Sequence, residues 1–174
     1  RVNLEGVPVR RRLRLRTWQK AALDDFERRS SSNFLVVATP GAGKTTFALA
    51  AILRDLANHP HRRVVIVTPT SHLKRQWTQA AGEVGLHLLD EWQPARGWPH
   101  EFHGVVVTYQ QVASVARAIA TTTTDAAVVF DEIHHAGADR AWGDAVGLAF
   151  EHAAWRLGLS GTPFRSDQNP IPFV

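Results

Sequence analysis

The chain has 174 residues, of which 44% are hydrophobic, and it carries a formal net charge of +4. This length suits one domain built around one core, and the moderate basic charge suits a polyanionic partner without identifying one. The sequence has no cysteine and no run of the ~18 apolar residues that a membrane helix needs, which excludes disulfides, thiolate metal sites and a helical membrane span.

The N-terminal segment is basic and carries little hydrophobic periodicity. Residues 1–12 include the cluster Arg10-Arg11-Arg12. We interpret them as a solvated arm, with a phosphate-contacting arm as the alternative, and residues 13–174 as one folded domain. From Thr17 onward, apolar residues recur at helical spacing and predict an amphipathic helix.

Short apolar runs then alternate with helical patterns. The runs expected to form buried parallel strands are 34–38, 64–67, 105–108, 127–130 and 156–159. The helical patterns between them are 44–57, 71–83, 110–120 and 139–153. This repetition predicts an α/β domain with a parallel sheet flanked by helices. The stretch 85–103 predicts one short strand at 86–89 and an irregular loop, in which Trp92 and Trp98 are candidates for partner contact.

The strongest local signal is a glycine-rich segment that follows the first expected strand and opens a helix. Its glycines let the backbone turn tightly, so that successive N–H groups face phosphate oxygens, and the helix adds the positive end of its dipole. Lys44 is expected to reach the β- and γ-phosphates, and the Thr45 hydroxyl to ligate Mg²⁺. Ala38 stands where the pattern has its first glycine. The predicted nucleotide-binding residues here are Pro40, Gly41, Ala42, Gly43, Lys44, Thr45 and Thr46.

An acidic pair follows the expected strand 127–130, in the tetrad Asp131-Glu132-Ile133-His134. Ligands of open α/β sheets bind at the carboxyl ends of the strands, so Asp131 is expected to hold Mg²⁺ through water and Glu132 to orient and deprotonate the attacking water. The doubled histidine does not predict a transition-metal site, because neighbouring residues do not converge on one ion without further ligands. The predicted catalytic residues are Lys44, Asp131, Glu132 and His134, and the predicted metal ligands are Thr45 and Asp131.

With these two motifs placed, the chain resembles superfamily 2 helicases from about residue 13 to residue 167. The similar segments are 15–19 (adenine-reading), 38–46 (motif I), 68–70 (motif Ia), 108–110 (nucleic-acid backbone), 131–134 (motif II, DExH form) and 160–165 (motif III). The chain is most similar to DNA translocases related to the xeroderma pigmentosum group B helicase and to the motor subunits of restriction enzymes. It is less similar to DEAD-box RNA helicases, which have Asp where this chain has His134.

The resemblance implies a RecA-like fold and the first of the two motor domains of an ATP-dependent helicase or translocase. It implies ATP and Mg²⁺ as cofactors, with Gln19 bonded to the adenine edge and Arg16 close by. Ser160 and Thr162 would couple the γ-phosphate site to nucleic acid. DNA is the expected nucleic acid, and its predicted contacts are Thr68, Pro69, Thr70, Arg75, Thr108 and Gln110.

The resemblance also implies a partner, the second RecA-like domain, which supplies arginines for turnover. The chain by itself is therefore expected to hydrolyse ATP barely. Because the sequence begins with neither a methionine nor an apolar leader, we expect a piece of a longer cytoplasmic protein, bacterial and associated with the nucleoid, and no membrane partner.

Two other interpretations stay open. A P-loop protein of another class, such as a small-molecule kinase or a switch GTPase, would give no role to Gln19 or to the tetrad 131–134, and the chain has no guanine-reading Asn-Lys-x-Asp sequence. A module that binds nucleotide or DNA without turnover is opposed by the intact Lys44, Asp131 and Glu132.

Overall fold

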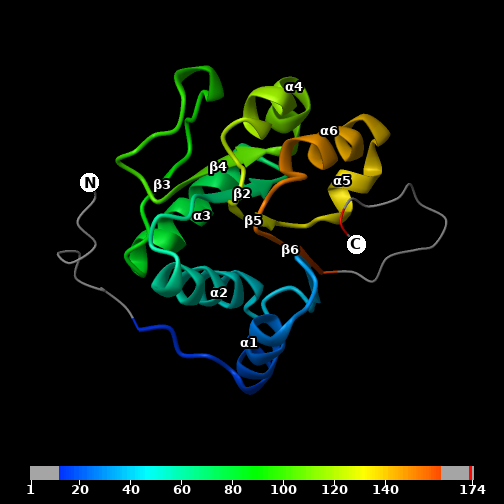
Figure 1. The fold of residues 1–174 in the computed structure, drawn as a ribbon. Coiled ribbons are helices and arrows are strands. Elements are labelled where there is room, and N and C mark those ends of the chain that lie inside the picture. The colour runs from blue at the N-terminus through cyan, green and yellow to red at the C-terminus, as the bar shows by residue number, and fades with distance from the viewer. Residues whose placement is uncertain (1–11, 162–172, 174) are drawn as a thin grey trace.

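The computed structural model describes residues 12–161 and Phe173. Its strands are β1 (Asn33–Val37), β2 (Val64–Thr68), β3 (Leu88–Leu89), β4 (Gly104–Thr108), β5 (Ala127–Phe130) and β6 (Trp155–Ser160). Its helices are α1 (Thr17–Arg28), α2 (Lys44–Asn58), α3 (Ser71–Glu83), α4 (Tyr109–Ala120), α5 (His134–Ala138) and α6 (Arg140–Phe150), with the 3-10 turn η2 (Pro94–Arg96). All strand pairs are parallel, in the order β1-β6-β5-β2-β4-β3. The predicted α/β fold is confirmed (Figure 1).

The sheet separates two apolar cores, one on each face. Alternate residues of β2 point to opposite faces, so that Val64 and Ile66 belong to the core under α1, α2 and α3, while Val65 and Val67 belong to the core under α4, α5 and α6. The four inner strands are buried along their whole length, which is why they read as continuous apolar runs in the sequence. None of the described helices has the length and apolar character needed to traverse a bilayer.

The carboxyl ends of the strands meet at one edge of the sheet because all strands run in the same direction. The end of β6 lies between the ends of β1 and β5, since β6 pairs with both. The segments that follow these three strands begin at Ala38, Asp131 and Gly161. Residues that are far apart in the sequence are thus brought to one place, which is where ligands bind in open α/β sheets.

The predicted helix 139–153 is shorter in the structure and is preceded by α5, which the sequence did not indicate. Asp139 lies between the two helices and its Oδ1 accepts a hydrogen bond from Ala141 N at 2.7 Å, which caps the start of α6. The helix ends at Phe150. An Asp that caps one helix also ends the preceding one, because its extended backbone interrupts the helical path.

The expectation that Trp92 contacts a partner is wrong. Trp92 is buried in the second core, and its Nε1 donates to Gly97 O at 2.9 Å. Trp98 is half-buried and packs edge-on against Trp92, with ring centroids 5.6 Å apart. The two tryptophans therefore pack the irregular loop against the second core and hold it on the sheet.

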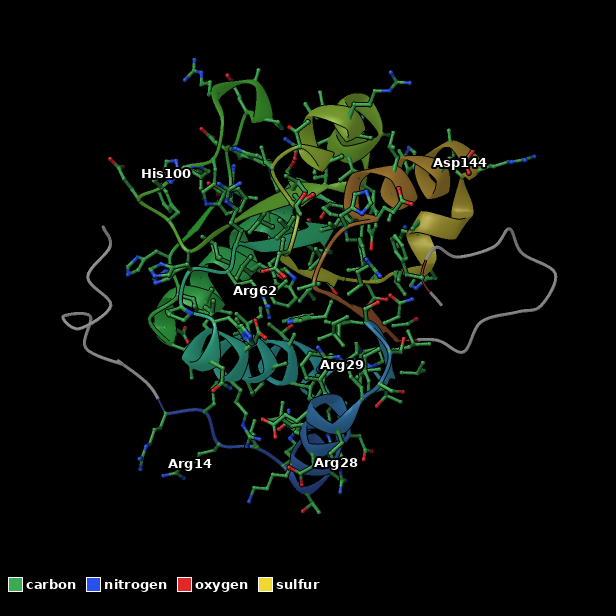
Figure 2. The ribbon with its side chains drawn as sticks, in the orientation of Figure 1. Arg14, Arg28, Arg29, Arg62, His100 and Asp144 are labelled. Atoms are coloured by element: carbon green, nitrogen blue, oxygen red, sulfur yellow. The ribbon has the colours of Figure 1, made fainter. Side chains whose placement is uncertain are left out.

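Several charged side chains lie near the opposite edge of the sheet and have partners within the fold. Arg62 donates to Asp55 Oδ1 at 2.6 Å, and the Arg29 guanidinium lies 3.8 Å from the centre of the Phe26 ring (Figure 2). Burial lowers the pKa of Arg29, and the charge of Asp55 acts against this decrease. The first contact joins α2 to the turn before β2, and the second lies at the end of α1, so we assign both arginines to the fold.

Candidate functional site

The glycine-rich loop joins β1 to α2 through two residues in the left-handed backbone region. Gly41 has φ +76° and Gly43 has φ +94°, a region that favours glycine. A Cβ atom at Gly43 would lie 2.4 Å from Gln19 Nε2, so a side chain there would require the Gln19 amide to move. Among the described residues no side chain caps the N-terminus of α2. The first N–H groups of α2 are therefore left for an anion.

The segment before α1 supports this loop. Gln19 is buried: its Oε1 accepts from Arg16 N at 2.7 Å, and its Nε2 donates to Gly43 O at 2.8 Å. Arg16 Nη1 and Trp18 Nε1 both donate to Ala42 O, at 3.1 and 3.2 Å. The structure therefore brings the predicted adenine-reading residues against the predicted phosphate-binding loop, and in this conformation the Gln19 amide holds the loop backbone.

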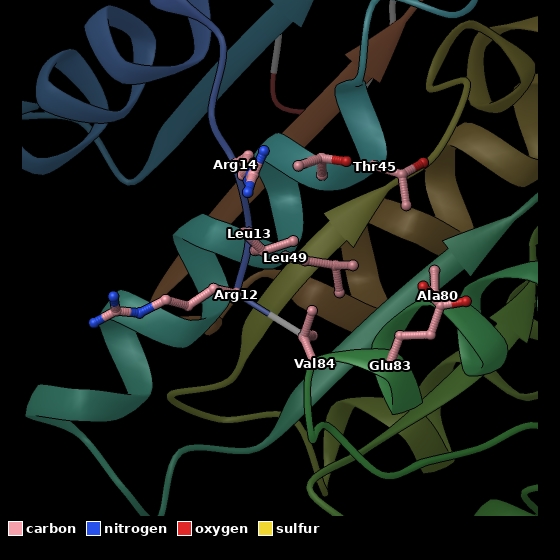
Figure 3. A pocket seen from close by; sticks show the side chains of 9 residues that line it. Arg12, Leu13, Arg14, Thr45, Leu49, Ala80, Glu83 and Val84 are labelled. Atoms are coloured by element: carbon pink, nitrogen blue, oxygen red, sulfur yellow. The ribbon is translucent and has the colours of Figure 1, made fainter. Parts of the chain in front are cut away.

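A cavity of about 630 Å³ adjoins the first turn of α2. Figure 3 shows that its walls come from the N-terminal segment, α2 and the end of α3. The lining residues are Arg12, Leu13, Arg14, Thr45, Thr46, Leu49, Ala80, Glu83 and Val84. Its volume lies in the range of small-molecule sites, and basic, hydroxyl and apolar groups all face it.

Lys44, Glu132 and Gly161 converge beside the loop, although they come from three different strand ends. A Cβ atom at Gly161 would lie 3.7 Å from Glu132 Oε1 and 3.8 Å from Lys44 Nζ. Lys44 Nζ donates to Ala38 O at 2.7 Å, and Ala38 N donates to Ser160 O at 3.0 Å. The sequence motifs I and II and the first two residues of motif III therefore form one continuous site.

Glu132 occupies a strained position in this site. Its φ of +47° lies in the left-handed region, which is uncommon for a residue other than glycine. Its Oε2 accepts from Gly161 N at 3.4 Å and lies 3.4 Å from His134 Nδ1, which also lies 3.3 Å from Ser160 Oγ. Ser160 is buried, and Thr162, its predicted coupling partner, lies outside the described residues.

Asp131 is held by two aromatic side chains to which sequence reasoning gave no role at the site. Trp77 Nε1 donates to Asp131 Oδ2 at 2.9 Å, and the Tyr109 hydroxyl donates to Asp131 O at 2.8 Å. Burial raises the pKa of Asp131, the hydrogen bond from Trp77 opposes this increase, and the charge of Glu132 adds to it. Tyr109 lies in the segment 108–110 that was compared with a helicase motif, and Trp77 lies in the helix that follows the segment 68–70, but the sequence does not show which way their polar atoms point.

The predicted nucleic-acid contacts separate into buried and exposed residues. Thr68 is fully buried and its hydroxyl donates to Thr70 O at 3.1 Å, while the buried Thr108 hydroxyl accepts from Gln111 N at 3.2 Å. In this conformation both side chains are buried, and Thr108 also borders the second cavity described below. Their short hydroxyl side chains are used to close the turns from β2 and β4 into helices.

The other predicted contacts lie at the surface, except for the half-buried Pro69. Thr70, Arg75 and Gln110 are exposed, and Thr70 also caps α3 by accepting from Leu73 N at 3.3 Å. A second cavity, of about 670 Å³, lies between the starts of α3 and α4. The exposed residues and the two helix starts therefore lie at the same end of the sheet as the glycine-rich loop, separated from it by the ends of β5 and β6.

The oxygen atoms at this edge fit magnesium better than a softer metal. Thr45 offers a hydroxyl and Asp131 a carboxylate, and hard oxygen donors of this kind, together with phosphate oxygens, suit Mg²⁺. Trp77 bonds only Oδ2 of this carboxylate, and the Glu132 backbone N–H also donates to the carboxylate. The residues present therefore fit a Mg²⁺ site whose oxygen ligands come partly from the protein and partly from a bound triphosphate.

Comparison with known proteins gives one family and one fold. The model of the family described as type III restriction enzyme, res subunit, matches residues 12–165. An uncharacterized protein of Mycobacterium leprae (strain TN) is 48% identical over 164 residues, which are 92% of this chain and 27% of that protein. This chain thus spans only about a quarter of the length of that curated relative.

Two solved structures have the same fold. The Sulfolobus solfataricus SWI2/SNF2 ATPase core in complex with dsDNA matches with a TM-score of 0.71 at 19% identity, over 94% of this chain and 35% of that one. The Pyrococcus furiosus Hef helicase domain matches with a TM-score of 0.71 at 23% identity, over 88% of this chain and 34% of that one.

Proposed function

The chain belongs to the family of the type III restriction enzyme res subunit, and it has the RecA-like fold of superfamily 2 helicase motor domains. We propose that it is the ATP-binding first motor domain of an ATP-dependent DNA helicase or translocase. In this proposal residues 1–12 form a basic arm and residues 13–174 the motor domain. The matched res-subunit family and the two helicase-type structures, one of them in complex with dsDNA, support this assignment. An activity on DNA would place the protein at the bacterial nucleoid.

The triphosphate would be held by the loop Pro40–Thr46 and by the start of α2. The open N–H groups of α2 and the ammonium of Lys44 supply the positive charge, and Lys44 would exchange its bond to Ala38 O for phosphate oxygens. The nucleoside would lie beside Arg16 and Gln19, with its sugar toward the adjoining cavity that Thr46 lines. A nucleotide fills such a volume and meets both apolar and polar walls there.

Thr45 and Asp131 would hold Mg²⁺, which when bound neutralises phosphate charge. Glu132 orients the attacking water and accepts its proton, and its position near Gly161 N and Lys44 keeps the carboxylate facing the phosphate loop. His134 lies between Glu132 and Ser160, so it connects the proposed base with the segment that begins motif III. Ser160 and Thr162 would transmit the state of the γ-phosphate to bound DNA.

DNA would lie across the starts of α3 and α4. Thr70, Arg75 and Gln110 are exposed there, next to the N–H groups of two helix starts, and such contacts bind the phosphate backbone without reading the sequence. Pro69 and the backbones of Thr68 and Thr108 shape these turns. A motor that moves along DNA needs binding of this sequence-independent kind.

The observation that carries the proposal is that Lys44, Glu132 and Gly161 lie close together at the carboxyl ends of the strands. The test is nucleotide binding by the 174-residue chain, followed by turnover in a longer form that includes the proposed second domain. Lys44→Ala should abolish binding of ATP with Mg²⁺. Glu132→Gln should keep binding and remove DNA-stimulated hydrolysis in the longer form, and retention of hydrolysis would show that Glu132 is not the base. Binding without any turnover in the unsubstituted longer form would instead indicate a binding module.

A further inference from the structure

Asp131 is contacted from both faces of the sheet by buried aromatic donors. Trp77 belongs to the core under α3, where it is 2% exposed, and Tyr109 belongs to the core under α4, where it is 0% exposed. The indole N–H bonds the carboxylate oxygen Oδ2 at 2.9 Å, while the phenol hydroxyl bonds the main-chain carbonyl at 2.8 Å. One donor therefore fixes the carboxylate and the other fixes the backbone that carries it.

Each aromatic is itself held in place. The Tyr109 ring stacks on Trp142 of α6 with centroids 6.2 Å apart and an interplanar angle of 12°. Trp77 sits in the middle of α3, whose start is capped by Thr70, and Tyr109 is the first residue of α4, whose start is capped by Thr108. The rigid indole limits rotation of the carboxylate, together with the Glu132 backbone N–H, and the rigid phenol limits movement of the backbone that carries it.

The need to satisfy a buried indole does not by itself explain the bond from Trp77. Trp155 is equally buried, 1% exposed, yet its Nε1 has no hydrogen-bond partner within the described part of the chain. The fold thus tolerates one buried indole N–H without a partner. The bond from Trp77 goes to a carboxylate whose burial raises its pKa, and it offsets part of that effect by stabilising the charged form.

We propose that Trp77 and Tyr109 are positioning residues for magnesium: together they hold Asp131 in the orientation in which its carboxylate supports Mg²⁺ bound with the nucleotide. This inference rests on the proposed function and adds two residues to it. Neither side chain touches nucleotide or metal, since both are covered by the sheet and the helices. The helices that carry them also begin at the proposed DNA surface, so the metal site and that surface share the same supports.

The test uses the 174-residue chain, AMP-PNP as the nucleotide, and binding measured by calorimetry across a range of MgCl₂ concentrations and in EDTA. Trp77→Phe should raise the Mg²⁺ concentration for half-maximal binding about tenfold, the effect of losing a hydrogen bond to a charged group. Tyr109→Phe, which removes one oxygen atom, should raise it about threefold, as for a neutral hydrogen bond. Affinity in EDTA should stay unchanged in both variants, because the phosphate loop is intact.

Trp155→Phe is the matched control, because it removes an equally buried indole that bonds nothing in the described structure. If the bond from Trp77 contributes only packing, Trp77→Phe and Trp155→Phe should lose melting temperature and affinity in EDTA to the same extent. The two variants should then also need the same Mg²⁺ concentration for half-maximal binding, and this result would overturn the inference. If Trp77→Phe does not fold, Tyr109→Phe is tested alone. An Mg²⁺ requirement equal to that of the unsubstituted chain would then overturn the inference. If the unsubstituted chain shows no Mg²⁺-dependent binding, the proposed function fails, and this inference with it.

Discussion

Gly43 is under two separate constraints, one on its backbone conformation and one on the space beside its Cα atom. Its φ of +94° is strained for any residue with a Cβ atom, and a Cβ there would meet Gln19 Nε2 at 2.4 Å. Gly41 meets only the first, because its φ is +76° but a Cβ would find nothing within 4 Å. Comparing substitutions at the two glycines therefore separates the effect of the backbone conformation from the effect of the contact with Gln19.

We predict that Gly41→Ala lowers the free energy of unfolding by about 1 kcal/mol, the cost of a left-handed backbone. Gly43→Ala should cost more and should also weaken ATP binding further, because the Gln19 amide must leave its bond to Gly43 O. Urea denaturation and calorimetric titration with ATP and Mg²⁺ measure the two effects. Equal losses in the two variants would show that the Gln19 contact contributes nothing.

At the scale of elements, α3 has one buried face and one exposed face with different tasks. Its buried face carries Trp77 and Lys74, and Lys74 Nζ donates to Asp90 O at 2.6 Å and to Gln111 Oε1 at 3.3 Å. Its exposed face carries Arg75. Because Lys74 already has partners inside the fold, Arg75 is the cation of this helix that is placed to meet a DNA phosphate.

We predict that Arg75→Ala weakens binding of duplex DNA to the chain and reduces its salt dependence. Each phosphate contact contributes about −0.9 to the slope of log affinity against log salt concentration, so the slope should become less negative by about one. Fluorescence anisotropy with a labelled duplex at several salt concentrations measures it. Arg28→Ala is the control: Arg28 is also exposed but pairs with Asp25 on α1, and its loss should leave the slope unchanged.

The segment between α3 and β4 contains a pair of histidines that makes the fold sensitive to acid. His87 N donates to His103 Nδ1 at 2.9 Å, and the two rings stack with centroids 5.7 Å apart. Burial lowers the pKa of His103, and the neighbouring His87 lowers it further. A histidine whose pKa is lowered by folding takes up its proton first in the unfolded chain, so stability falls as the pH drops below about 6.5.

We predict that His103→Asn makes the melting temperature less dependent on pH between pH 7.5 and pH 5.5. The Asn side-chain oxygen can accept the same hydrogen bond from His87 N, but it cannot be protonated in this range. Differential scanning fluorimetry at a series of pH values is the measurement, with His61→Asn, which removes an exposed histidine, as the control. A pH profile identical to that of the unsubstituted chain would contradict the assignment.

At the scale of the whole molecule, the proposed site lies open at one edge of the sheet. Lys44, Glu132 and Gly161 come together there, and the side chains of Glu132 and His134 are 30% and 31% exposed. Hydrolysis at such a site needs a further source of positive charge, which stabilises the charge that develops on the γ-phosphoryl group in the transition state. In the proposed function the second RecA-like domain supplies it.

We predict that the 174-residue chain binds ATP with Mg²⁺ but hydrolyses it more slowly than a longer two-domain form by a factor on the order of 10³ or more, the usual worth of an arginine supplied in trans. A phosphate-release assay with and without duplex DNA compares the two forms. Brisk, DNA-stimulated hydrolysis by the chain alone would mean that its own residues complete the site.

The sequence by itself determined, apart from α5, the succession of strands and helices along the chain, and it determined the glycine-rich loop between β1 and α2. Both depend on local pattern: a buried parallel strand reads as an apolar run wherever it stands, and Gly41 and Gly43 have their geometry because of their own backbone freedom. The acidic pair was placed for the same reason, because it directly follows β5. For these features, the local sequence determines the local structure, because the residues that shape each feature are close together in the chain.

Only the tertiary structure decided where the polar atoms of buried side chains point. Trp77 and Asp131 are 54 residues apart in sequence, and their hydrogen bond depends on how α3 packs on the sheet. Trp92 is likewise buried in the packed structure, and the hydroxyls of Thr68 and Thr108 form hydrogen bonds within the turns that follow β2 and β4. Hydrophobic periodicity reports which face of an element is buried, but a hydrogen bond needs a defined distance and direction between two atoms, and these exist only once the elements have packed.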